Sequence, residues 1–197
     1  MRFLRTYIKV VDTFNAVIGR IITYGIFVMM GILLWSIITK NQFIDSLFEA
    51  IDGPSLWTLE AAQFSMITYF FLGGAYAVQM GSHVRMDLFY DNWSPKRKAF
   101  TDLVMVFCLL TYLVVLLWGG LGSTAYSLGY FGSEPIGFFV GLVNGSEEVG
   151  TMERSRTLWR PYLWPIKTVL CIGIVLMLLQ ALSELFKDFL RIRGEVL

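Results

Sequence analysis

Residues 18–39 read IGRIITYGIFVMMGILLWSIIT, and no charged side chain occurs between Arg20 and Lys40. A helix of about 20 apolar residues is long enough to cross the roughly 30 Å hydrocarbon core of a bilayer. Backbone polar groups in lipid must be hydrogen-bonded within their own segment, so a single spanning segment of this kind is helical. The stretch therefore predicts a transmembrane helix.

Three further stretches are also long and apolar, and together the four account for the low charge content of the chain. The 197 residues are 56% hydrophobic and only 16% charged, whereas about 25% charged residues is usual for a soluble domain. The predicted spans are 18–39, 59–80, 99–121 and 165–186. We therefore expect an all-α integral membrane protein in which residues 1–197 form a single membrane domain with four transmembrane helices.

Two segments outside the spans have patterns of their own. Near the N-terminus, apolar side chains recur at helical spacing at Leu4, Ile8, Val11, Phe14 and Ile18. This spacing predicts an amphipathic N-terminal segment, which either lies among the lipid headgroups or simply extends the first span. Before the fourth span, residues 122–160 form a long, glycine-containing loop. Its apolar run 136–143 is too short to span, so we expect it to lie on the membrane or against a partner.

The distribution of Lys and Arg predicts the orientation. Eleven of these residues fall at the two termini and in the loop after the second span, and five fall in the other two loops. Because positive charge accumulates on the cytoplasmic side, both termini are expected in the cytoplasm and the loop 122–160 in the periplasm. A basic cluster from Arg154 to Lys167 runs against this rule, and the neighbouring glutamates indicate local pairing as its explanation.

The spans lack the residues that catalysis or autonomous transport would need. Ionisable groups inside a membrane are costly and are retained for function, and here they all lie near the ends of the predicted spans. His83 is the only histidine, which excludes a haem held by two histidines of one copy. Cys108 and Cys171 lie in apolar stretches and are expected to be buried as small hydrophobic side chains. We therefore expect no enzyme activity, cofactor or metal, and the net charge of +1 gives no indication of nucleic-acid binding.

Small residues on the second span indicate a packing surface. At intervals of four residues, interrupted by Tyr69, the span carries Ala61, Ser65, Gly73, Ala77 and Gly81. Small side chains let helix backbones approach closely in lipid, where packing drives association. The stripe is expected either to pack within this chain or to contact another protein, and the remaining apolar surface faces membrane lipid or a larger partner.

Short motifs run through the second span and the loop after it. In order they are WTLE at 57–60, FLGGA at 71–75, HVRMD at 83–87 and SP at 94–95. Their order and topology resemble the small membrane subunit of tripartite ATP-independent periplasmic (TRAP) transporters, the DctQ family. The stretch WRPYLWPIK at 159–167 resembles the entry to the fourth span in longer members of this family.

The resemblance implies one part of an uptake system in the bacterial inner membrane. A periplasmic solute-binding protein would capture an organic anion. A large TRAP membrane subunit, on a separate chain, would carry the substrate and sodium sites. The small subunit would scaffold the large subunit and help to dock the binding protein. The extended loop 122–160 departs from the shorter members of the family.

The motifs and the stripe together give candidate residues for a subunit interface: Glu60, Gly73, Ala77, Gly81, His83, Arg85 and Asp87. Glu60 opens the second span, where the helix dipole favours a carboxylate; alternatively it contacts the large subunit. Arg85 either anchors the cytoplasmic side or pairs with a carboxylate or a lipid phosphate. A different class of function, a four-helix membrane anchor or assembly subunit of a respiratory or other enzyme complex, fits the four-span layout as well.

Overall fold

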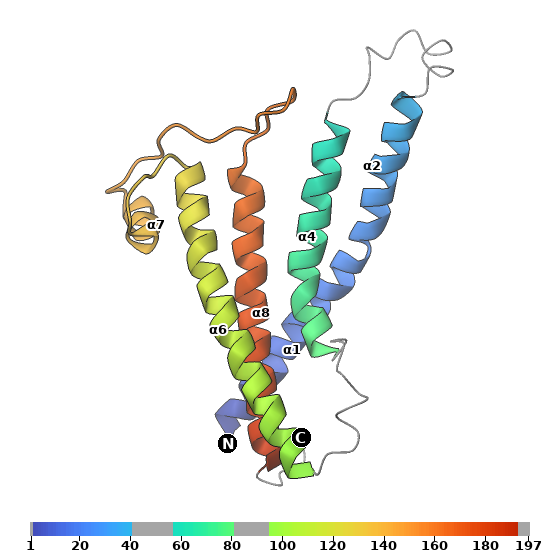
Figure 1. Ribbon diagram of the computed structural model, residues 1–197, viewed down its shortest axis with the longest axis vertical. Coiled ribbons are helices and arrows are strands. Elements are labelled where there is room, and N and C mark those ends of the chain that lie inside the picture. Colours follow the sequence, from blue (N-terminus) through green and yellow to red (C-terminus); the bar gives the residue numbers. More distant parts are fainter. Residues whose placement is uncertain (1, 41–56, 81–94, 193–197) are drawn as a thin grey trace.

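Helices make up most of the computed structural model, which describes residues 2–40, 57–80 and 95–192 (Figure 1). These helices are α1 (Arg2–Thr23), α2 (Gly25–Thr39), α4 (Thr58–Gln79), α6 (Pro95–Ser127), α7 (Pro135–Asn144) and α8 (Trp164–Ile192). Four helical stretches are long and apolar enough to cross a membrane: Leu4–Thr39, Thr58–Gln79, Leu103–Ser127 and Trp164–Leu190. The prediction of an all-α integral membrane fold with four transmembrane helices is confirmed.

The bundle is arranged around α8. This helix packs against α4, α6 and α1, whereas α2 lies beside α4 on the far side from α8 (Figure 1). α1 begins and α8 ends at the same end of the bundle, which we call the terminal end. The connection between α6 and α8, with α7 in it, lies at the opposite end, which we call the loop end. The last helix in the sequence is thus the central one.

α1 and α2 form one helical rod that is interrupted by a turn at Tyr24. The amphipathic pattern of α1 is real, because Ile8 and Val11 are buried against the bundle. Phe14, however, is 55% exposed, and the buried face continues through Asn15 instead. The segment packs against both α4 and α8. Its buried face is therefore covered by two helices of the chain.

The core of the bundle lies between α6 and α8. Leu113 of α6 contacts Ile174 and Ala181 of α8 in a fully buried cluster, and Phe71 of α4 packs against its side. Ala181 leaves room for the neighbouring helix, as small residues do in membrane bundles. Prolines occupy the first turns of both helices, since α6 begins at Pro95 and α8 begins one residue before Pro165; a proline is tolerated there because the first N–H groups of a helix have no partner within it.

The segment between α6 and α8 differs from a simple loop. α6 continues to Ser127, six residues beyond the predicted end of the third span at Leu121. The apolar run 136–143 forms the short helix α7, which has a proline in its first turn and ends at Gly145 with φ 72°, a left-handed conformation that suits glycine. A hairpin between Glu153 and Leu163 then leads into α8.

Candidate interaction sites

Glu60 lies in the first turn of α4 and is only 4% exposed. Its Oε1 accepts a hydrogen bond of 3.2 Å from the Ser155 hydroxyl, which belongs to the hairpin before α8. Its Oε2 is buried and has no hydrogen-bond partner among the described residues. The structure therefore gives Glu60 an internal role that the sequence did not indicate: it attaches the hairpin to the loop end of α4.

The hairpin is held by several contacts at its base. Ser155 N–H donates to the Pro161 carbonyl at 2.9 Å, and Leu163 N–H donates to the Glu153 carbonyl at 3.2 Å. Glu153 also forms an ion pair of 2.7 Å with Lys167 in the first turn of α8. This pair confirms that a neighbouring glutamate compensates part of the basic cluster.

Further along the hairpin, Arg154 lies over the ring of Tyr162, with its guanidinium carbon 4.4 Å from the ring centroid, and it also donates a hydrogen bond to the Tyr162 hydroxyl. Beyond this pair the tip is exposed, and it carries Arg156, Leu158, Trp159 and Arg160. Leu158 is 82% exposed. The hairpin thus presents cationic and apolar side chains on a base tied to α4 and α8.

The predicted small-residue stripe on α4 divides into two parts. A Cβ added to Gly73 would lie 3.7 Å from Ile22 of α1, so Gly73 serves packing within the chain. Ala77, one turn further, is exposed. Gly81, His83, Arg85 and Asp87 lie outside the described residues, and their roles stay predictions.

The closest helix contacts involve glycines that the sequence reasoning did not select. A Cβ added to Gly173 of α8 would lie 2.6 Å from the Phe71 Cβ and 2.7 Å from its carbonyl carbon and oxygen, so α4 and α8 touch backbone to backbone there. A Cβ on Gly74 would meet the flexible end of Met177, also on α8, at 2.9 Å. A Cβ on Gly19 of α1 would overlap the Tyr76 side chain of α4. α1, α4 and α8 thus approach one another closely at Gly19, Gly74 and Gly173.

A polar cluster joins α1 to α8 toward the terminal end. The Asp12 carboxylate accepts hydrogen bonds at its Oδ1 from the Gln180 amide and the Ser183 hydroxyl, each 2.9 Å long. Its Oδ2 lies 2.7 Å from the Lys187 ammonium, which also lies 2.7 Å from Glu184. Asp12 therefore satisfies three donors of α8 from the neighbouring helix.

Two further amides extend this cluster. The Asn15 amide, fully buried on α1, donates a 2.8 Å hydrogen bond to Gln180 Oε1. The Gln79 amide of α4 donates to the Asp12 backbone carbonyl at 3.1 Å. Sequence reasoning missed the cluster, although Gln180, Ser183, Glu184 and Lys187 recur at helical spacing on the fourth span. That stripe of polar residues could have indicated a polar contact between the fourth span and another helix.

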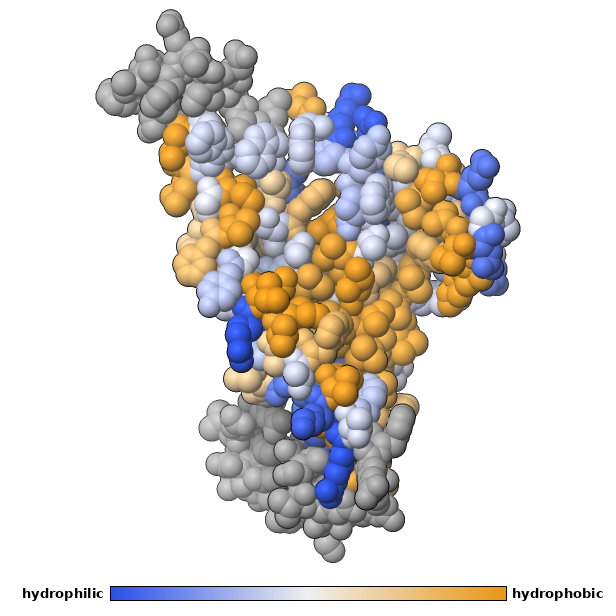
Figure 2. Space-filling model, turned by 180° about the vertical axis from the view of Figure 1, so that it is seen from behind, coloured by the Kyte–Doolittle hydropathy of each residue, from blue (hydrophilic) through white to orange (hydrophobic). Residues whose placement is uncertain are grey.

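Outside these contacts the bundle exposes apolar surface (Figure 2). The most apolar windows of Leu4–Thr39 and Leu103–Ser127 are 0% and 6% buried by the rest of the chain. Cys108 of α6 is on this exposed surface, so the expectation that the chain buries it is wrong. Cys171 is buried as expected and contacts Thr124 at 3.4 Å.

The described residues contain no group of three or more His, Cys, Asp or Glu side chains that could hold a metal ion. The polar groups that they do bring together are used in contacts between helices and in the hairpin. The arrangement is that of a membrane helix bundle with extensive apolar faces, whose loop end carries the helix α7 and the hairpin before α8.

Comparison with known proteins identifies the family of this chain. No curated protein and no solved structure is significantly similar to the chain. The family model for the DctQ component of tripartite ATP-independent periplasmic transporters matches residues 29–191. This range includes α4, α6 and α7, all of α8 except its last residue, and most of α2. The chain belongs to the DctQ family and is a small permease component of a TRAP transporter, a multi-pass protein of the inner membrane.

Proposed function

We propose that the chain is the scaffold of the large membrane subunit in a sodium-driven system for uptake of organic anions. In this proposal the large subunit is a separate chain that carries solute and sodium, and a periplasmic solute-binding protein delivers the solute. Both termini lie in the cytoplasm and the loop end faces the periplasm, as the Lys and Arg distribution predicts. Membership in the DctQ family supports the assignment to a transporter rather than to a respiratory enzyme complex.

The scaffold proposal rests on one observation: the ionisable groups described below form contacts between segments of the chain itself. Asp12, Glu184 and Lys187 are engaged with one another between α1 and α8, and Glu60 holds the hairpin. These ionisable groups act in contacts between segments of the chain. At the same time, α2 and α6 leave apolar faces that their own bundle does not cover. A rigid bundle with such faces is suited to brace a larger membrane protein.

Reconstitution tests the proposal directly. The large subunit and the binding protein would be assayed in liposomes for sodium-driven solute uptake, with and without this chain. We expect uptake to require the chain and the chain alone to give no flux. Full and stable uptake by the large subunit without it, or solute flux through the chain alone, would contradict the scaffold role.

Ala77 offers a sharper test of where the large subunit binds. It is exposed on α4 and lies six residues before the HVRMD motif that carries His83, Arg85 and Asp87 in the sequence. We propose that these residues form one interface with the large subunit. A bulky side chain at such a contact costs about 1–3 kcal/mol. We therefore expect Ala77→Leu to lower the amount of large subunit that co-purifies with the chain by about tenfold.

The stability of the isolated chain is the control for this substitution. Ala77→Leu should leave the thermal unfolding temperature of the chain in detergent unchanged, because the side chain points away from its own bundle. Gly73→Leu should instead lower that temperature, since Gly73 faces Ile22 of α1. Unchanged co-purification with Ala77→Leu would exclude this face of α4 from the interface.

A further inference from the structure

α7 is a short apolar helix with one covered face and one open face. The covered face is fixed by Phe138, which is buried and stacks on Tyr130 with the ring centroids 4.6 Å apart. The open face carries the aliphatic side chains of Ile136, Val140 and Val143, and Val143 is 86% exposed. No residue of α7 is charged. Exposing this apolar face to water would be energetically unfavourable, so we ask what covers it.

The position of α7 places it beside the membrane-spanning part of α6. α7 is seen nearly end-on in Figure 1, so it runs across the bundle rather than along it. It shares a groove with Leu121 of α6, which precedes the helix end at Ser127 by six residues or about 9 Å. Leu121 belongs to the stretch Leu103–Ser127 that is apolar enough to span. α7 therefore lies at the depth of the bilayer leaflet at the loop end.

Both ends of α7 are flanked by a polar, acidic side chain. Glu134 precedes the first turn, and Glu147 follows the last one, where the Ser146 N–H donates to the Gly141 carbonyl at 2.8 Å. Carboxylates are expensive in hydrocarbon and stay at the aqueous boundary. With a carboxylate at each end, the helix is held parallel to the membrane plane, and its open face turns toward the acyl chains. Figure 2 shows this corner as a hydrophobic surface edged by hydrophilic side chains.

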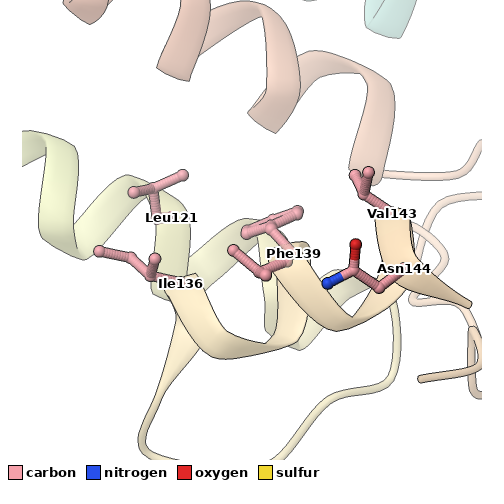
Figure 3. Close-up of a pocket in the computed structure, with 6 residues that line it drawn as sticks. Leu121, Ile136, Phe139, Val143 and Asn144 are labelled. Carbon is pink, nitrogen blue, oxygen red and sulfur yellow. The ribbon is translucent and has the colours of Figure 1, made fainter. Parts of the chain in front are cut away.

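The groove between α6 and α7 has the chemistry of an acyl-chain site. It has a volume of about 370 Å³ and is lined by Leu121, Ile136, Phe139, Val140, Val143 and Asn144 (Figure 3). Asn144 carries the one polar side chain among these six. The groove continues the outward apolar face of α6, where Val114 and Trp118 are exposed. Protein contacts draw their energy mainly from Trp, Tyr and Arg anchors, and the open face of α7 has none of these.

We propose that α7 is an in-plane membrane helix in the leaflet at the loop end, and that its groove with α6 binds a phospholipid acyl chain. The Asn144 amide lies where it can donate a hydrogen bond to an ester carbonyl of that lipid. This inference does not depend on the proposed transport role, because it concerns only the contact between α7 and lipid.

Spin labels at two matched positions test the proposal. Val143→Cys and Leu158→Cys place labels at two highly exposed aliphatic positions of the same connecting segment, in a Cys108→Ser background. The full chain would be reconstituted in vesicles of phosphatidylethanolamine and phosphatidylglycerol. Collision with oxygen, which dissolves in lipid, would be compared with collision with a water-soluble nickel complex. We expect the label at Val143 to favour oxygen several-fold and the label at Leu158 to favour nickel.

Other outcomes have clear meanings. A Val143 label that favours nickel as the Leu158 label does would place α7 in water and overturn the proposal. A Val143 label shielded from both reagents would mean that protein, such as a second copy of the chain, covers α7, which also overturns it. Circular dichroism of both labelled variants shows whether the helices remain folded.

Discussion

Gly173→Leu is expected to prevent the bundle from closing. A Cβ at this position would lie 2.6–2.7 Å from the Cβ, carbonyl carbon and carbonyl oxygen of Phe71. Two of these atoms belong to the backbone of α4, so the clash cannot be relieved by a new rotamer, and the two helices have to separate. Overpacking costs about 1–3 kcal/mol and occasionally more; here we expect the upper part of that range. The measurement is the thermal unfolding temperature of the purified chain in detergent, together with its monodisperse yield.

The matched control is Gly31→Leu. Gly31 lies in α2, and no described atom would come within 4 Å of a Cβ added there. The same increase in size at this position should leave the unfolding temperature nearly unchanged. A Gly173→Leu chain as stable as the Gly31→Leu chain would show that α4 and α8 do not touch at Phe71.

Asp12→Ala is expected to release α1 from α8. The substitution removes the acceptor of the Gln180, Ser183 and Lys187 contacts at once. The ion pair is largely buried, with side-chain exposures of 15% for Lys187 and 21% for Asp12. Removing one partner of a buried pair costs about 3–5 kcal/mol when the other charge is left uncompensated. Lys187 keeps its ion pair with Glu184 at 2.7 Å, and both Asp12 and Lys187 keep some exposure, so we expect a loss at or below the lower end of that range, about 3 kcal/mol, measured as the loss of unfolding free energy in detergent.

Two further variants isolate the contribution of this pair. Lys9→Ala removes an exposed charge from the same helix and should have little effect. Lys187→Met combined with Asp12→Ala removes both charges, and the double variant should be less unstable than the sum of the single losses, as expected for residues in contact. Strict additivity of the two losses would show that Asp12 and Lys187 do not interact.

The sequence predicted the secondary structure well because hydropathy reports directly on bilayer crossing. It predicted four spans and located the apolar run 136–143, although it did not predict that this run forms the helix α7. It did not predict the end of α6. The glycine-containing loop was expected to begin at residue 122, but glycine is tolerated in membrane helices, whose backbone has no water to bond with. The helix continues through Gly122 to Ser127.

The contacts were less predictable, because they depend on how the helices are rotated about their axes. A repeated stripe of small residues is visible in a sequence, whereas Gly173 is an isolated glycine that only the crossing with Phe71 makes essential. Glu60 was selected from its position at a helix start, but its partner Ser155 is 95 residues away. Asp12 lies off the apolar stripe of the N-terminal segment in the sequence, yet the structure turns it toward Lys187 of α8.

The central place of α8 has a consequence for how the protein is made. A ribosome releases α1, α2, α4 and α6 before the helix that contacts most of them. Until then Asp12 and Asn15 have no Gln180 to bond with, and the Phe71 turn of α4 has no Gly173 beside it. The earlier helices can enter the bilayer one by one, but their final packing waits for α8. The contacts that join α1, α4 and α6 to α8 can therefore form only after all of these helices have been synthesised.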